Sequence, residues 1–138
     1  MDLITLKNWS SAEVAQVVDV SLKMKSDPDR FDGTMKGKNL ALLFQKTSTR
    51  TRYTGEIGMI QLGGHAVYLD WDVTNFGTAD LGDEIKVLLL YADLVLVRLL
   101  KHADVLKAKE TSTVPVMNGC SDRYHPLQAL ADVMTIQE

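Results

Sequence analysis

The sequence changes from strand-like to helix-like within Phe44-Gln45-Lys46-Thr47-Ser48-Thr49-Arg50-Thr51-Arg52. The apolar run Asn39–Phe44 precedes this turn, and the helix-like segment that follows it is expected to end before Gly63-Gly64. The start of a helix exposes backbone N–H groups without partners and the positive end of the helix dipole. Hydroxyl side chains and two arginines add donors at the same place. The turn therefore predicts an anion-binding site, with phosphate as the natural ligand.

Before and after this turn in the sequence, short apolar runs alternate with segments of helical periodicity. Strands separated by helices imply a parallel sheet with right-handed crossovers. We therefore predict an α/β fold, a three-layer domain in which a four-stranded parallel sheet is flanked by helices, with residues 1–138 forming one domain. The expected strands are 39–44, 65–69, 94–98 and 114–118, and the expected helices are 11–25, the segment after the anion turn, one opening at Asp80 or Gly82, 102–110, and one from Pro126 to the last residue.

The composition argues against several classes of protein. The 138 residues carry a net charge of −3 and no long basic run, which argues against a nucleic-acid-binding protein. Cys120 is the only cysteine, so no internal disulfide forms, which suits a reducing compartment. No segment approaches about 18 uninterrupted apolar residues. We expect a soluble, cytoplasmic protein without a membrane anchor.

Further polar side chains follow other strands of the predicted sheet. Arg98 ends the third strand, and His125 and Gln128 flank the start of the helix after the fourth. In parallel sheets ligands bind beyond the carboxyl ends of the strands, so these groups are expected near the anion turn. The histidines His65, His102 and His125 lack the close spacing of zinc motifs, and no Gly-x-Ser-x-Gly nucleophile motif occurs. We therefore predict neither a metal nor a cofactor.

Simpler structural roles compete with these interpretations. Arg98 could be a charge at a strand end that pairs with Asp93, and His125 with Gln128 could merely cap a helix. The turn itself could be a solvated helix start, although its basic residues oppose the helix dipole unless an anion is bound. His102 is expected on a helix surface.

Two motifs resemble the aspartate and ornithine carbamoyltransferases. These are Ser48-Thr49-Arg50-Thr51-Arg52 and, later in the chain, His125-Pro126-Leu127-Gln128. Between them, Leu62-Gly63-Gly64-His65, Ala92-Asp93 with Arg98, and Asn118-Gly119-Cys120-Ser121-Asp122 are similar to the ornithine branch. The resemblance covers nearly the whole chain but only the amino-terminal, carbamoyl-phosphate-binding half of the family.

The resemblance implies a role for each motif residue. Ser48, Thr49, Arg50 and Thr51 would bind the phosphate of carbamoyl phosphate. Arg98 would reach both the phosphate and the carbonyl oxygen. His125 would face the carbonyl oxygen, and Gln128 would bind the carbamoyl amide. Thr51, Arg98, His125 and Gln128 would thus serve catalysis of carbamoyl transfer to an amine, with ornithine as the first choice of acceptor and citrulline and phosphate as products.

The resemblance also implies features beyond these residues. The family binds its amine acceptor on a second domain, which we expect to be absent from residues 1–138, so this domain alone should be weakly active or inactive. The family resemblance implies a homotrimer in which His65 and the loop 70–84 lie near a neighbouring subunit's site. The ornithine branch usually has a Gly-x-x-Glu-Ser-x-x-Asp-Thr-like pattern in this loop, where this chain has Phe76, Ala79, Asp80, Asp83 and Glu84 instead. This departure leaves aspartate or a polyamine open as acceptor. A non-catalytic anion-binding or assembly module of the same fold is the other alternative.

Overall fold

The computed structural model describes all 138 residues and contains one four-stranded parallel sheet. The strands lie in the order β2-β1-β3-β4, so β1 and β3 are neighbours although β2 lies between them in the sequence. The predicted sheet is confirmed, but β4 begins two residues later than expected. The strands are β1 (Asn39–Phe44), β2 (His65–Asp70), β3 (Leu94–Arg98) and β4 (Val116–Cys120).

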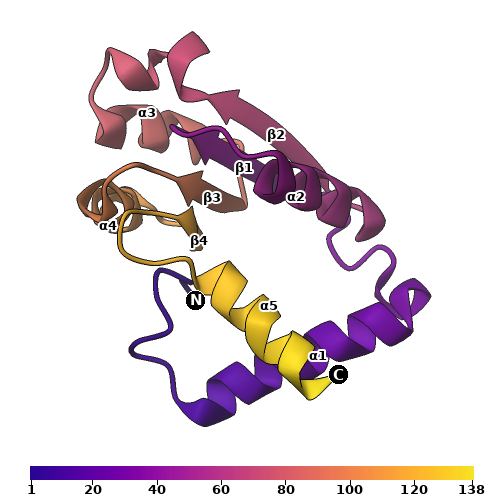
Figure 1. Cartoon of the computed structure of the whole chain (residues 1–138). Helices are drawn as coiled ribbons and strands as arrows, with labels where there is room; N and C mark the ends of the chain where they lie inside the picture. Colours follow the sequence, from indigo (N-terminus) through magenta and orange to yellow (C-terminus); the bar gives the residue numbers. More distant parts are fainter.

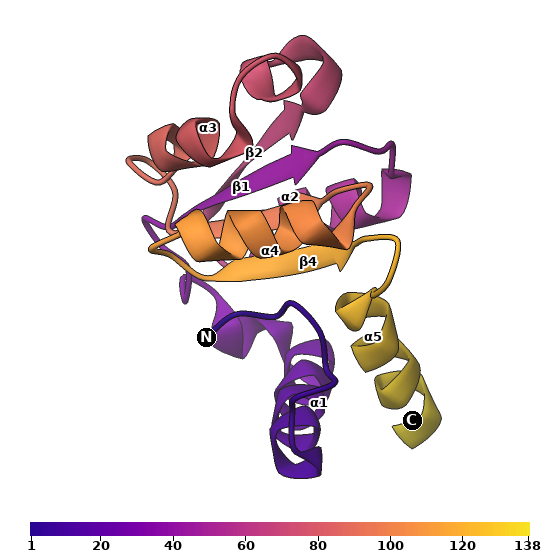
Figure 2. The same cartoon turned by 90° about the vertical axis from the view of Figure 1, so that its left-hand side faces the viewer.

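Helices cover both faces of the sheet, which gives the predicted three layers. Helix α2 covers one face, and α3 and α4 cover the other (Figures 1 and 2). Helices α1 and α5 pack against each other beyond the β4 edge of the sheet, and both ends of the chain lie on this side (Figures 1 and 2). The helices are α1 (Ser11–Ser26), α2 (Thr49–Gln61), α3 (Leu81–Leu88), α4 (His102–Thr111) and α5 (Pro126–Gln137), with short 3₁₀ turns at Pro28–Phe31, Trp71–Val73 and Asn75–Gly77.

Alternation along the strands divides the core into two clusters. On the α2 face, Leu42 of β1 packs with Met59 of α2, and both side chains are buried. A Cβ at Gly55 would lie 2.9 Å from Leu42 Cδ2, so this glycine allows α2 to approach the sheet closely. On the opposite face, Leu43 belongs to a larger cluster that includes Ile85 of α3 and residues of α4. Burial on both faces explains why the strands read as continuous apolar runs.

The order of the strands indicates where on the sheet a ligand is expected to bind. The chain leaves β1 toward β2 on one side and then crosses to β3 on the other side of β1. Ligands of open α/β sheets bind at such a reversal, beyond the carboxyl ends of the strands. The carboxyl ends of β1 and β3 are paired as Phe44 with Arg98.

None of the helices combines the length and the apolar character that a membrane-spanning helix requires.

Candidate functional site

The predicted anion turn forms the start of α2. Ser48 is the N-cap residue, and its Oγ accepts the backbone N–H of Thr51 at 3.3 Å. The other amides of the first turn have no partner within a helix, and the first turn contains no acidic side chain. Because the Ser48 oxygen accepts from the backbone, its hydroxyl proton is free to donate to a ligand. The turn thus presents backbone N–H groups, hydroxyl groups and the positive end of the α2 dipole at one place.

Gln45 connects this turn to the end of β3. Its backbone N–H donates to the Arg98 carbonyl oxygen at 2.9 Å, and its Oε1 accepts the N–H of Leu100 at 3.0 Å. These bonds fix the segment after β1 beside the segment after β3. Sequence patterns did not reveal this role of Gln45, because it depends on the neighbouring positions of β1 and β3, which do not follow from the order of elements along the chain.

Arg98 lies half-buried between the two motifs. Its Nη1 donates to the carbonyl oxygen of Gly119 at 3.1 Å, across an irregularity in the β3–β4 pairing. Its Nε is the only buried side-chain nitrogen or oxygen in the structure without a hydrogen-bond partner. The alternative pairing with Asp93 is wrong, since Asp93 binds Lys38 at 2.8 Å. The Arg98 guanidinium is therefore not neutralised by a carboxylate and keeps its charge for a ligand.

His125 is the N-cap residue of α5. Its Nδ1 lies 3.4 Å from the backbone nitrogen of Gln128. An amide nitrogen can only donate, so Nδ1 is the acceptor and the proton of the neutral ring sits on Nε2. Burial lowers the pKa of His125, and the charges of Arg98 and Arg50 lower it further, while Asp132 has the opposite effect. The site therefore favours a neutral imidazole with a donor on Nε2.

The side chain of Gln128 is oriented by a second contact on α5. Its Nε2 donates to Asp132 Oδ1 at 2.8 Å, one helical turn further along. This bond fixes which end of the amide is the nitrogen and leaves Gln128 Oε1 as an acceptor. Gln128 thus offers an acceptor next to the donors of the α2 turn and Arg98.

These groups line one pocket of about 360 Å³. It contains the starts of both α2 and α5, so two helix dipoles point their positive ends toward it. All residues predicted to bind carbamoyl phosphate line the pocket, except Thr49. Thr54, Leu127 and Ala131 also line the pocket and were not predicted. Thr54 lies three residues after Thr51, and Ala131 lies three after Gln128. This helical spacing could have identified both residues from the sequence. The lining residues are Ser48, Arg50, Thr51, Thr54, Arg98, His125, Leu127, Gln128 and Ala131.

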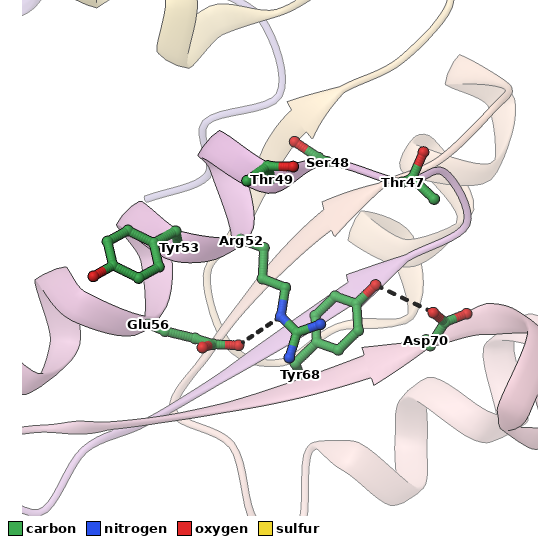
Figure 3. Close-up of a pocket in the computed structure, with 8 residues that line it drawn as sticks. All are labelled: Thr47, Ser48, Thr49, Arg52, Tyr53, Glu56, Tyr68 and Asp70. Carbon is green, nitrogen blue, oxygen red and sulfur yellow. Dashed lines mark hydrogen bonds and ion pairs between the residues drawn. The ribbon is translucent and has the colours of Figure 1, made fainter.

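Thr49 lines a second pocket, between the start of α2 and the end of β2 (Figure 3). There Arg52 lies over the ring of Tyr68, 3.7 Å from its centroid, and pairs with Glu56 at 2.9 Å. Burial raises the pKa of the Tyr68 hydroxyl, and the nearby Asp70 carboxylate adds to this rise. Arg52 is thus already paired, whereas Arg50 and Arg98 face the first pocket without a carboxylate partner.

The other histidines lie outside the pocket. His65 is exposed at the start of the edge strand β2, away from the groups described above. His102 was expected on a helix surface, and this prediction is wrong, because only 7% of the residue is exposed. No group of three or more histidine, cysteine, aspartate or glutamate side chains is arranged to hold a metal ion.

Fold and site together define an α/β domain with a pocket rich in anion-binding groups at the carboxyl ends of its central strands. More particularly, the chain belongs to the family described as aspartate/ornithine carbamoyltransferase, carbamoyl-P binding domain, whose model matches residues 1–138. The catabolic ornithine carbamoyltransferase of Halobacterium salinarum is 38% identical over 137 residues, which are 99% of this chain and 46% of that protein. An ornithine carbamoyltransferase of Bacillus cereus is 40% identical over 138 residues, or 99% of this chain and 43% of that protein.

Solved structures agree with this assignment. The ornithine carbamoyltransferase of Thermus thermophilus superposes with a TM-score of 0.90 at 39% identity, over 99% of this chain and 47% of that one. An aspartate transcarbamoylase of Trypanosoma cruzi in complex with carbamoyl phosphate has a TM-score of 0.90 at 24% identity, over 99% of this chain and 46% of that one, which shows the shared fold alone. The chain spans about half the length of these relatives.

Proposed function

We propose that the pocket between α2 and α5 binds carbamoyl phosphate, and that residues 1–138 act as the donor-binding half of a carbamoyltransferase. The observation that carries this proposal is the convergence of six side chains in one pocket, those of Ser48, Arg50, Thr51, Arg98, His125 and Gln128. The unpaired Nε of Arg98 supports it, since an unpaired buried donor is unfavourable unless a ligand or function compensates.

The chemistry follows from the donors and acceptors. Ser48, Arg50 and Thr51 bind the phosphate oxygens together with the free amides at the start of α2. Thr49 contributes through the backbone of that turn, because its side chain lines the neighbouring pocket. Gln128 Oε1 accepts from the carbamoyl –NH₂ group, and this contact selects a carbamoyl ester of phosphate over phosphate alone.

The proposed reaction is transfer of the carbamoyl group to an amine. The amine nitrogen attacks the carbamoyl carbon, negative charge builds on the carbonyl oxygen, and the bond to the phosphate oxygen breaks as the amine proton passes to the leaving phosphate. His125 Nε2–H and Arg98 stabilise the carbonyl oxygen, while Arg50 and the α2 start stabilise the leaving phosphate. Removal of one donor from such an oxyanion site typically costs about 2.7–4 kcal/mol. No step requires a cofactor or a metal.

The proposal also covers the identity of the amine acceptor and the oligomeric state of the protein. The identities to ornithine carbamoyltransferases favour ornithine, with citrulline and phosphate as products and a place in arginine metabolism. We propose a second domain that binds the amine, a cytoplasmic homotrimer, and a position of His65 near a neighbouring subunit. Light scattering tests the trimer, and a purely monomeric protein contradicts it.

Calorimetric titration tests the donor site. Carbamoyl phosphate should bind the wild-type chain, and Arg50→Ala should abolish detectable binding, because a charge-assisted phosphate contact is lost. Arg30→Ala is the matched control, since Arg30 lies in the Pro28–Phe31 turn outside the pocket. Unchanged binding in a folded Arg50→Ala variant overturns the assignment of this turn.

Turnover tests the transferase itself. With the acceptor domain supplied in the same chain or as a separate chain, ornithine should yield citrulline, and aspartate should not react. Tight donor binding without transfer to ornithine, aspartate or a polyamine would instead favour a non-catalytic anion-binding module.

A further inference from the structure

His102 lies at the start of α4 and is nearly buried although it takes no part in the pocket. Lys101, the N-cap residue of this helix, makes no capping hydrogen bond with its side chain. Instead, Asp122 Oδ1 accepts the backbone N–H of His102 at 2.7 Å. A carboxylate at a helix start is favourable because it pairs a free amide and faces the positive end of the dipole. The cap of α4 thus comes from the loop that leads to His125.

The ring of His102 contacts the same loop. Its Nδ1 lies 3.2 Å from Ser121 Oγ, and the ring meets that of Tyr124 in a T-shaped pair with centroids 4.9 Å apart. Ser121 Oγ also accepts the backbone N–H groups of Arg123 at 3.3 Å and Tyr124 at 3.2 Å. A hydroxyl has two lone pairs and one proton, so only its proton remains to be donated.

Two acceptors lie near that proton. The carbonyl oxygen of Tyr124 is the more distant, at 3.4 Å from Ser121 Oγ, and it already accepts the backbone N–H of Ser121 at 3.0 Å. His102 Nδ1 is closer and has no other partner on the ring's Nδ1 side. Nδ1 of His102 is therefore the acceptor of the Ser121 hydroxyl.

The 121–124 turn is held from two directions. Asn118, fully buried in β4, donates from Nδ2 to the carbonyl oxygens of Ile4 at 3.0 Å and Tyr124 at 3.3 Å. His102 holds the other side of the turn through Ser121 and Tyr124. The next residue is His125, whose φ of −135° and ψ of 73° are not helical. The turn therefore sets the direction from which the His125 ring enters the pocket.

We propose that His102 is a positioning residue that fixes His125 in the pocket through Ser121 and Tyr124. His102 is not among the residues that line the pocket. Its ring accepts the Ser121 proton and packs on Tyr124, so the turn keeps one conformation. Loss of the acceptor frees the Ser121 hydroxyl to rotate, and the backbone groups of Arg123 and Tyr124 lose a fixed partner.

The experiment compares two substitutions that each keep one property of the ring. His102→Phe keeps an aromatic ring against Tyr124 but lacks the acceptor. His102→Asn keeps an acceptor near the place of Nδ1 but lacks the ring. Val105→Ala is the control for loss of stability, because Val105 is fully buried on the same helix and packs in the core. Thermal unfolding of each variant reports its folded fraction.

The main readout is the pair of imidazole ¹⁵N chemical shifts of His125, which report its tautomer and hydrogen bonding. We expect His102→Phe to move these shifts and to weaken carbamoyl phosphate binding about fivefold, the equivalent of about one net hydrogen bond. We expect His102→Asn to remain near wild type in both measurements. Movement in both His102 variants, but not in Val105→Ala, also supports the positioning role and assigns part of it to the Tyr124 contact.

Two results overturn the proposal. One is a His102→Phe variant whose His125 shifts equal those of the wild type. The other is an equal movement in Val105→Ala, which would mean that any loss of stability disturbs His125. The affinity readout rests on the proposed function, whereas the ¹⁵N shifts do not. A wild-type chain that fails to bind carbamoyl phosphate therefore contradicts the proposed function and leaves the test of His102 intact.

Discussion

His125 Nδ1 accepts the backbone N–H of Gln128 at 3.4 Å, so one imidazole both caps α5 and faces the pocket. The capping role occupies the Nδ1 lone pair, so the proton of the neutral ring sits on Nε2. At the level of the sequence, capping and function were alternatives for this pair. In the structure the cap fixes the tautomer that the proposed function needs, and the two roles are compatible.

The first prediction concerns stability against pH. The pKa of His125 is lowered in the folded state from its ordinary value of 6.5, chiefly by burial. The unfolded state therefore binds more protons between the lowered value and 6.5, and stability rises with pH over this window. The contribution is fully present above 6.5 and is lost as the pH falls through the folded value.

His125→Asn tests this prediction, since asparagine is a good N-cap residue but does not titrate. We expect a stability near that of the wild type at pH values above the window, and a flatter dependence of the unfolding free energy on pH within it. The measurement is denaturant unfolding at a series of pH values. An identical pH profile in the two proteins would show that His125 does not carry the effect.

The second prediction distinguishes recognition of the carbamoyl group from recognition of the phosphate group of the proposed ligand. Gln128→Met should weaken binding of carbamoyl phosphate about fivefold or more and leave the affinity for inorganic phosphate unchanged, because only the carbamoyl –NH₂ group meets Gln128 in the proposed pose. Asp132→Ala should have a smaller effect in the same direction, since it removes the partner of Gln128 Nε2. Parallel titrations with the two ligands provide the test, and equal losses for both would contradict the assigned role.

Most of the fold could be predicted from local sequence patterns, because continuous apolar runs and helix starts carry strong signals. The shift of β4 has a local cause: Val114 bonds to Ser112 Oγ in a turn, and Pro115 has no N–H to donate. The strand then continues through Gly119 to Cys120, because the β3–β4 register shifts near Arg98. That irregularity depends on pairing between distant segments, which periodicity does not encode.

The candidate site was less completely predictable than the fold. Ser48, Arg98 and His125 were identified because they follow apolar strands or match a motif. The roles of Gln45 and His102 were missed, since each depends on contacts between elements that are distant in the sequence. Local patterns thus identified residues that line the pocket, while the residues that hold them in place required the tertiary structure.

The last prediction concerns close packing at Gly119. A Cβ at this position would lie 2.6 Å from Leu96 Cδ2 and 3.4 Å from Thr51 Cγ2, and the carbonyl oxygen of Gly119 accepts from Arg98. Gly119→Ala should therefore destabilise the fold by about 1–3 kcal/mol, as overpacking of a core does. It should also weaken phosphate binding, because β4 must move away from both Thr51 and Arg98.

Gly58→Ala is the matched control for Gly119→Ala. A Cβ at Gly58, a second glycine of α2, would meet no atom within 4 Å, so an alanine side chain fits there without a clash. Alanine in a helix interior is favoured over glycine by about 1 kcal/mol, and Gly58→Ala should stabilise the chain without changing phosphate affinity. Denaturant unfolding and phosphate titration of both variants give the comparison. Equal stability and equal affinity in Gly119→Ala and the wild type would mean that Leu96 yields without moving β4, and that Gly119 does not position Arg98.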